Sequence, residues 1–120
     1  MSHVVTIKSQ VKDEDCARQA AAEVGAQVIG NGEHKLFREQ RAVGFAIKLD
    51  GWKFPAVFDL ATGAAHFDNY NGSWGAPAKL SAFQQAYGIA VAKKAARLSG
   101  RSLISSTPQA DGSVRLVFAG

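Results

Sequence analysis

Two residues of a predicted strand have the types and spacing of an acid–base pair. His66 and Asp68 stand two positions apart, so in a strand they project from the same face, together with Tyr70. A carboxylate beside an imidazole can orient the ring as a general base. The sequence around them offers no nucleophile and no substrate pocket. We therefore favour a hydrogen-bonded surface pair and keep His66 and Asp68 as weak catalytic candidates.

The three histidines do not have the spacing of a metal site. His3, His34 and His66 fall in three separate segments, and no H-x-x-x-H or H-x-x-E pattern connects any of them to a second ligand. Structural or surface roles are the expected ones. We predict that the protein holds no metal and no cofactor.

The one cysteine stands near the start of a predicted helix, where the helix dipole favours a thiolate. Cys16 also shares one helix face with Ala20 and Val24, at spacings of four and eight. Free cysteines are commonly buried and unreactive. We predict a buried thiol, with a redox role as the alternative, and a lone thiol suits a reducing compartment.

The glycines do not form a phosphate-binding loop. Gly30 and Gly32 lack a following Gly-Lys-Ser/Thr and do not lie between a strand and a helix. The stretch Gly72-Ser73-Trp74-Gly75 does precede a helix, so its backbone amides offer a weak candidate site for an anion.

Residues 34–41 combine cations with an aromatic residue. Lys35, Arg38 and Arg41 flank Phe37, and sites for single-stranded nucleic acid have this composition. Glu39 interrupts the positive charge. The alternative is a solvated loop whose Phe37 anchors into the core.

A second candidate surface is aromatic. Tyr70 and Trp74 lie on or beside the clearest loop of the chain, and Trp52 follows a turn. Aromatic residues on loops suit a contact surface for a protein or a ligand. They would equally well fold back over the end of the following helix, and the sequence leaves both alternatives open.

Length and composition predict one intracellular domain over residues 1–120. The chain has 14 Lys and Arg against 10 Asp and Glu, and its formal charge of +4 favours anionic partners only weakly. The first residues lack the basic and apolar regions of a secretory signal. No apolar run is long enough to cross a membrane. We expect a cytoplasmic protein.

The periodicity of apolar residues predicts two helices and about seven short strands. Asp13, Glu14 and Asp15 favour a helix start, and Gly25 favours its end. Asp50-Gly51 predicts a hairpin turn, and Pro55 an edge strand or a bulge. The predicted helices cover residues 16–24 and 79–98; the predicted strands cover residues 3–11, 27–29, 42–49, 52–60, 64–70, 102–106 and 113–118, with residues 30–41 as a loop or irregular ribbon.

The second helix is predicted to bury an apolar stripe at spacings of three and four, formed by Leu80, Phe83, Tyr87, Val91, Ala95 and Leu98. If both helices cover the same sheet face, all elements can share one core. We predict an α+β fold, with a single, mostly antiparallel sheet and two helices on one face, in the order β-α-β-β-β-β-α-β-β.

Short motifs in a fixed order resemble one family. They are the opening MSH with a strand that ends in TIK, Asp50-Gly51 with a strand that ends in Phe58-Asp59-Leu60, the helix segment FQQAY, and the closing DGSVRL. This order is similar to that of the conserved hypothetical family first named from chloroplast genomes as reading frame thirty-five, a domain of unknown function. The resemblance covers nearly the whole chain, but residues 32–41 and the C-terminal residues depart from the family pattern. It implies a compact intracellular accessory protein, and no catalytic residues can be carried over.

We therefore expect a non-enzymatic binding or adaptor module for a protein partner, with Tyr70, Trp74 and Trp52 as contact residues. The first alternative is single-stranded nucleic-acid binding through the basic loop and Lys53. The weaker alternative is an enzyme that uses His66 and Asp68. A homodimer is expected to form through the sheet face away from the helices, where Val4, Thr6 and Ala46 are predicted to lie.

Overall fold

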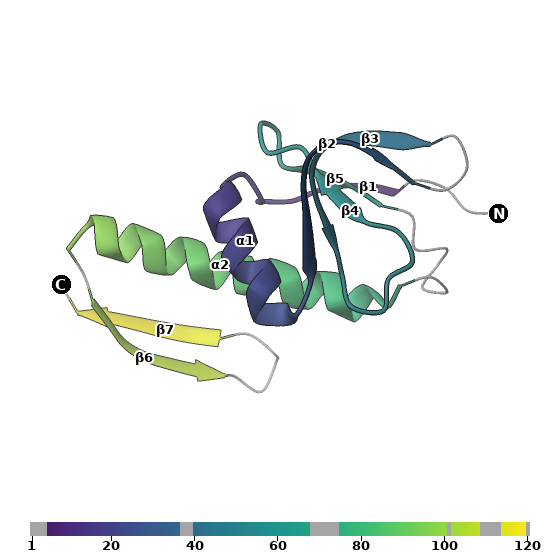
Figure 1. Ribbon diagram of the computed structural model, residues 1–120. Coiled ribbons are helices and arrows are strands. Elements are labelled where there is room, and N and C mark those ends of the chain that lie inside the picture. The colour runs from purple at the N-terminus through teal and green to yellow at the C-terminus, as the bar shows by residue number, and fades with distance from the viewer. Residues whose placement is uncertain (1–4, 37–39, 68–74, 101, 109–113, 120) are drawn as a thin grey trace.

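In the part of the chain that the structure describes, two helices and seven strands follow one another in the predicted order (Figure 1). The computed structural model describes residues 5–36, 40–67, 75–100, 102–108 and 114–119. The elements are β1 (Val5–Lys8), α1 (Glu14–Val24), β2 (Gln27–Lys35), β3 (Arg41–Lys48), β4 (Ala56–Phe58), β5 (Ala64–Phe67), α2 (Pro77–Leu98), β6 (Ser102–Pro108) and β7 (Val114–Ala119). The α+β class and the order of elements are confirmed.

The first five strands form one antiparallel sheet in the order β1-β5-β4-β3-β2. As far as the structure describes the chain, β6 and β7 pair with each other and do not join this sheet, which corrects the prediction of a single sheet. The reason is the length of α2, whose 22 residues span about 33 Å. This helix carries the chain away from the sheet, and the β6–β7 hairpin lies beside its C-terminal part (Figure 1).

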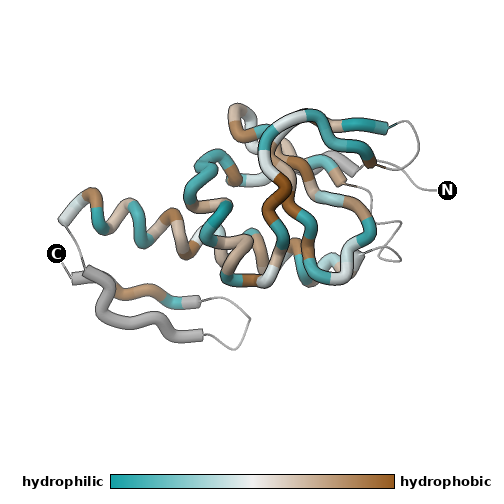
Figure 2. Tube along the Cα trace, in the orientation of Figure 1, coloured by the Kyte–Doolittle hydropathy of each residue, from teal (hydrophilic) through white to brown (hydrophobic). Residues whose placement is uncertain are grey.

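Both helices pack on the same face of the five-stranded sheet. Phe45, Phe58 and Phe67 project from three neighbouring strands into the core that α1 and α2 cover. The Phe58 ring lies 5.3 Å from the ring of Phe83 on α2. Figure 2 shows the matching pattern along α2, where hydrophobic and hydrophilic residues alternate. The predicted arrangement of helices on one face is confirmed.

Local signals determine where α1 begins and ends. The Asp13 carboxylate accepts a hydrogen bond from the backbone N–H of Cys16 at 3.1 Å, as an N-cap does. Gly25 ends the helix in the left-handed conformation, with φ of 72°. The predicted boundaries of this helix agree with the structure to within two residues at its start and coincide at its end.

Residues 30–41 were predicted to form a loop or an irregular ribbon, and as far as Lys35 the structure shows the ribbon and not the loop. Residues up to Lys35 belong to β2, and the β2–β3 ladder continues until Lys35 faces Arg41. The ladder is irregular between Val28 and Gly30, where a bulge shifts the register. Gly30 has a φ of 110°, which side chains rarely allow, so the glycine accommodates the bulge instead of ending the strand.

The sequence predicted an edge strand or a bulge at Pro55, and the structure shows neither. It directly precedes β4, which is the central strand of the sheet. Proline has no backbone N–H to donate to a neighbouring strand, and because Pro55 lies before the first residue of β4, the sheet needs no such hydrogen bond there. The turn at Asp50-Gly51 is confirmed by the hydrogen bond from Trp52 N–H to the Leu49 carbonyl at 3.0 Å.

The apolar stripe of α2 is buried only in its first half. Leu80, Phe83 and Tyr87 belong to the core, whereas Val91 is 38% exposed and Leu98 is 81% exposed. The described members of the main core end at Ala90 on this helix, so the C-terminal part of α2 runs beyond the sheet. The prediction that the whole stripe is buried is therefore wrong.

Candidate functional site

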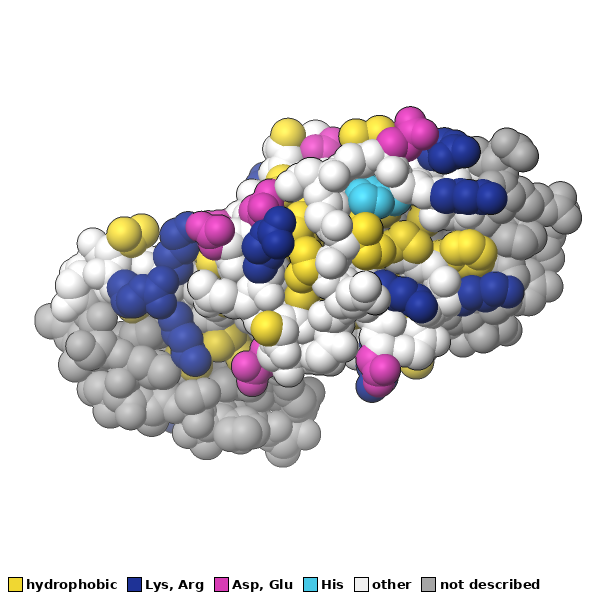
Figure 3. All heavy atoms as spheres, in the orientation of Figure 1, with side chains coloured by type: hydrophobic (Ala, Val, Ile, Leu, Met, Phe, Trp, Pro, Cys, Tyr) yellow, Lys and Arg dark blue, Asp and Glu magenta, His cyan; other side chains and the backbone are white. Residues whose placement is uncertain are grey.

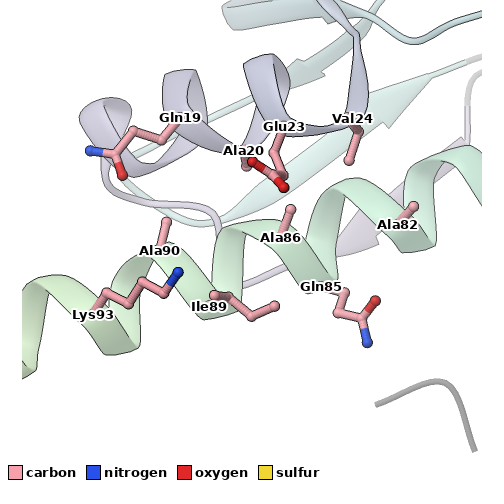
Figure 4. A pocket seen from close by; sticks show the side chains of 10 residues that line it. All are labelled: Gln19, Ala20, Glu23, Val24, Ala82, Gln85, Ala86, Ile89, Ala90 and Lys93. Carbon is pink, nitrogen blue, oxygen red and sulfur yellow. The ribbon is translucent and has the colours of Figure 1, made fainter. Parts of the chain in front are cut away.

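An open groove runs between α1 and α2, with a volume of about 390 Å³ (Figure 4). Alanines form its floor, and two of them, Ala20 and Ala90, are almost fully buried. Short side chains let the two helices lie close together and leave a shallow channel between the longer side chains on either side. The lining residues are Gln19, Ala20, Glu23, Val24, Ala82, Gln85, Ala86, Ile89, Ala90 and Lys93.

Polar side chains stand on both rims of this groove. Gln19 and Glu23 project from α1, and Gln85 and Lys93 project from α2 (Figure 4). One rim therefore carries a carboxylate and the other an ammonium group, above an apolar floor. Sites for amphipathic peptide segments have this arrangement.

One end of the groove is held by contacts between α2 and the start of α1. The Tyr87 hydroxyl accepts hydrogen bonds from the backbone N–H groups of Lys12 and Asp13, both at 2.9 Å. Lys94 Nζ lies 2.5 Å from Asp13 Oδ2. The hydrogen bond from Lys94, together with that from the Cys16 N–H, lowers the pKa of Asp13, and the same contact with Asp13 raises the pKa of Lys94. These contacts fix the position of α1 relative to α2.

A hydrogen-bond network connects α1 to the sheet. Glu14 accepts hydrogen bonds from Asn31 on β2 at 2.7 Å and from Arg18 at 2.9 Å. These two bonds lower the pKa of Glu14, with the bond from Asn31 as the larger cause. The Arg18 guanidinium lies 5.2 Å from the centre of the Phe45 ring. The groove is thus built on a helix that is held to its neighbours at several points.

The side chain of Cys16, which belongs to α1, is fully buried, as predicted. Burial raises the pKa of its thiol, and the Asp13 carboxylate raises it further. The thiol is therefore protonated near neutral pH and inaccessible. It contributes to packing, and the groove does not include it.

A second hollow of about 510 Å³ lies where residues 9–11 meet α2. Its lining includes Ser9, Gln10, Gln84 and Val91, and among the lining residues that the structure describes none carries a charge. Ser9 is itself occupied, since its hydroxyl donates to the Gly63 carbonyl at 2.6 Å. The groove between the helices has charged groups of both signs and is the better candidate for a selective contact.

Of the predicted acid–base pair, the structure describes His66 and not Asp68. His66 lies on β5, half-buried, where its Cα pairs with those of Thr6 and Val57. Its neighbours Ala65 and Phe67 face the core, so His66 projects from the opposite face of the sheet. Asp68 and Tyr70 lie outside the described residues, and the catalytic hypothesis stays untested.

The described residues contain no group of three potential metal ligands. His34 lies with its Nε2 atom 2.9 Å from the Gly30 carbonyl oxygen and 3.2 Å from that of Gly44, so it is held by the ribbon backbone. His3 lies outside the described residues. Within the described helices, none has the length and apolarity to cross a membrane.

Trp52 is buried, which removes it from the predicted contact surface and agrees with the alternative in which the aromatic side chains fold back over the following helix. It is 2% exposed, and its indole N–H donates to the Ala76 carbonyl at 3.1 Å. Its ring meets the Phe67 ring edge-on, with 5.5 Å between centroids. The turn before it directs the ring inward, where it covers the start of α2. Tyr70 and Trp74, with Gly72 and Ser73 of the proposed anion loop, lie outside the described residues.

The basic segment is the end of the β2–β3 ribbon. Lys35 and Arg41 are exposed and face each other, while Arg41 also lies 3.5 Å from the Glu33 carboxylate. Leu36 is fully buried here. It provides a core anchor of the kind expected of Phe37, which, like Arg38 and Glu39, lies outside the described residues.

Among the described residues, the Lys and Arg side chains are not confined to this ribbon (Figure 3). Figure 3 shows Lys and Arg side chains in several separate groups, with acidic side chains among them. Lys53, the fourth predicted cation, lies 5.9 Å from the centre of the Phe54 ring.

The sheet face away from the helices is partly covered, which weakens the predicted dimer contact there. Ala46 is fully buried in a small cluster with Leu36 and Val57, so it is not available to a second copy. Val4 lies outside the described residues. These three buried residues show that the outer sheet face has a small apolar cluster of its own.

The groove between the helices was not predicted, although its signal was present in the sequence. Ala82, Ala86 and Ala90 recur every four residues along one face of α2. Such a row predicts close helix packing. That α1 is the neighbouring helix, and that the channel stays open, depends on the tertiary fold.

Comparison of the chain with models of protein families, with curated proteins and with solved structures finds no match in any of the three. The functional argument consequently rests on the residues and geometry of the groove.

Proposed function

We propose that this chain is a non-enzymatic binding module that engages a segment of a protein partner in the groove between α1 and α2. The observation that supports the proposal is the alanine floor between two polar rims, on helices held together by Tyr87 and Lys94. A preformed groove binds at a lower entropic cost than a surface that must first become ordered.

An amphipathic helix is the partner segment that fits this groove best. A helix presents apolar side chains at spacings of three and four, and these can enter a shallow channel between two other helices. Glu23 and Lys93 on opposite rims would then select the orientation of the segment through its own charges.

A bulky cation in the groove tests this proposal. Ala82 is exposed and lines the groove, whereas its exposed neighbour Ser81 does not. We expect Ala82→Arg to weaken partner binding by at least about tenfold, as loss of a central contact does. Ser81→Arg adds the same charge outside the groove and is expected to bind like the unmodified protein.

Partners captured by the tagged protein, a second copy of the chain included, would be identified by mass spectrometry. Each purified partner would then be titrated against the three proteins by calorimetry. Equal affinities for Ala82→Arg and Ser81→Arg would overturn the assignment of the groove.

A second candidate function is binding of single-stranded nucleic acid, favoured by one observation. Lys35 and Arg41 are exposed directly opposite each other at the end of the β2–β3 ribbon. Replacing both with alanine should reduce the dependence of log affinity on log salt concentration by about 1.4 for a single strand. Failure of the unmodified protein to retain single-stranded DNA or RNA on a filter at low salt would exclude this function.

A further inference from the structure

The two helices that form the groove have opposite charges. α1 carries three carboxylates against one guanidinium, whereas α2 carries four cations and no acid. The residues concerned are Glu14, Asp15, Arg18 and Glu23 on α1, and Lys79, Lys93, Lys94 and Arg97 on α2. The groove therefore separates an acidic helix from a basic one.

Some of these charges are paired within the chain. Glu14 pairs with Arg18 at 2.9 Å, Lys94 with Asp13 at 2.5 Å, and Lys79 with Asp50 at 3.5 Å. Within the described part of the chain, four charges on the two helices are left without an ion pair. Those four are Asp15 and Glu23 on α1, and Lys93 and Arg97 on α2.

Two of the unpaired charges, Glu23 and Lys93, line the groove, and the other two stand at helical spacings that extend the same faces. Asp15, Gln19 and Glu23 recur every four residues along α1, and the last two line the groove. On α2, Lys93 lines the groove and Arg97 follows four residues later. An acidic row and a basic row thus border the same channel.

We infer that the partner of this groove is a second copy of the chain, in a two-fold dimer that packs helix layer against helix layer. This inference rests on the proposed function, because it uses the surface around the same groove and names the partner that covers it; in this dimer the two grooves face each other, and no helix enters either of them. A two-fold axis parallel to the groove places the acidic α1 of each copy over the basic α2 of the other. Every favourable contact then occurs twice.

The charges also disfavour the main alternative arrangement. A two-fold axis across the groove would place α1 over α1 and α2 over α2, so that like charges face each other. A partner with a single sign of charge would match one rim and repel the other. The chain itself carries the complementary pattern of both signs.

Charge reversal in separate proteins tests the dimer. Glu23→Lys makes the acidic rim more basic, and Lys93→Glu makes the basic rim more acidic. Each variant alone brings like charges together at both symmetric contacts. We expect dissociation constants at least about tenfold higher than that of the unmodified protein.

An equimolar mixture of the two variants provides the decisive measurement. In a dimer with one copy of each variant, Lys at position 23 on α1 of the first copy faces Glu at position 93 on α2 of the second copy. At the other contact, the unmodified α1 of the second copy faces the unmodified α2 of the first. Opposite charges therefore meet at both contacts, and the mixture should form a heterodimer of nearly unmodified affinity. Native mass spectrometry distinguishes the heterodimer by mass, and sedimentation velocity at several concentrations gives the affinities. Lys48→Glu, an exposed change at the end of β3, is the control and should dimerise normally.

The outcomes separate this inference from the proposed function. An unmodified protein that stays monomeric at every soluble concentration overturns the dimer, while the Ala82→Arg titration with another partner still tests the groove. A mixture that stays monomeric also overturns the dimer. If the protein dimerises and neither the charge variants nor Ala82→Arg change its affinity, the dimer uses another surface and this inference is wrong.

Discussion

At the scale of single residues, Tyr87 does more than fill the core. Its ring belongs to the main cluster, and its hydroxyl accepts the backbone N–H groups of Lys12 and Asp13 just before α1 begins. The N–H groups before and within the first turn of a helix need partners from elsewhere. The Tyr87 hydroxyl oxygen, on α2, accepts hydrogen bonds from two of these N–H groups.

Tyr87→Phe should therefore lower the free energy of unfolding by about 1–3 kcal/mol, because two partly buried donors lose their acceptor while the ring is retained. Urea unfolding followed by circular dichroism measures the change. Ser81→Ala, on the exposed side of the same helix, is the control and should change stability little. Equal stability of Tyr87→Phe and the unmodified protein would show that water replaces the hydroxyl.

Asp13 makes stability depend on pH in a defined direction. Its folded-state pKa is lowered by the hydrogen bonds from Lys94 and from the Cys16 N–H, below an unfolded value of about 3.9. The ionised carboxylate thus contributes stability above about pH 4, and the contribution is lost as the pH falls through the lowered pKa. Because the Asp13 and Lys94 side chains are each about one third exposed, the effect is modest.

Asp13→Asn isolates this contribution, since asparagine also caps helices but does not titrate. We expect the unmodified protein to be the more stable at pH 7, and the difference to shrink as the pH is lowered below about 4. Urea unfolding of both proteins across this range provides the test. A difference that stays constant with pH would assign the effect to capping geometry and not to charge.

At the scale of elements, the contact between β3 and β4 requires a glycine. Gly44 has a φ of 155°, and a Cβ atom there would lie 2.3 Å from the Phe58 carbonyl oxygen. Both groups belong to strands, so neither can move away without disturbing the ladder. This close approach sets the position of Phe58, which packs on α2.

Gly44→Ala is accordingly expected to lower the free energy of unfolding by at least about 2 kcal/mol. Gly88→Ala gives the opposite expectation: a Cβ atom there meets nothing within 4 Å, and the site is helical. Alanine should stabilise that position by about 0.8–1 kcal/mol. Thermal unfolding of both variants would test the pair, and a stable Gly44→Ala protein would contradict the close contact.

At the scale of the whole molecule, the chain is elongated. Its radius of gyration is 15.2 Å, against about 13.6 Å for a compact domain of this length, and its extents are 50 × 30 × 21 Å. The second half of α2 and the β6–β7 hairpin produce this shape (Figure 1). The hairpin contacts the rest of the protein chiefly through α2.

A chain that ends after Ser99 should keep the main fold, because the described core lies between Val11 and Ala90. Two-stranded sheets contribute little stability by themselves. We expect the shortened protein to unfold cooperatively, with a near-ultraviolet circular dichroism signal from Trp52 like that of the full chain. Loss of that signal would show that the hairpin completes the core.

Much of the fold could be predicted because its signals are local. Asp13 and Gly25 mark the ends of α1 by capping chemistry, and Asp50-Gly51 marks a turn by backbone preference. The burial of Cys16 follows from its place on a small-residue helix face. In each case the neighbours that matter lie within a few positions along the chain.

The remaining features depend on residues that are distant in sequence, and these only the tertiary structure decided. Trp52 is buried because its ring contacts Phe67 and its indole N–H donates to the Ala76 carbonyl, although its position after a turn predicts exposure. Val91 continues an apolar stripe and yet is exposed, because the sheet ends before it. The sequence alone determined the α+β class, the order of elements and the helix caps. Only the tertiary structure decided which apolar helix faces are buried and that α1 and α2 border a groove. Burial depends on two surfaces that come into contact, whereas the periodicity of a segment describes only the surface of that segment.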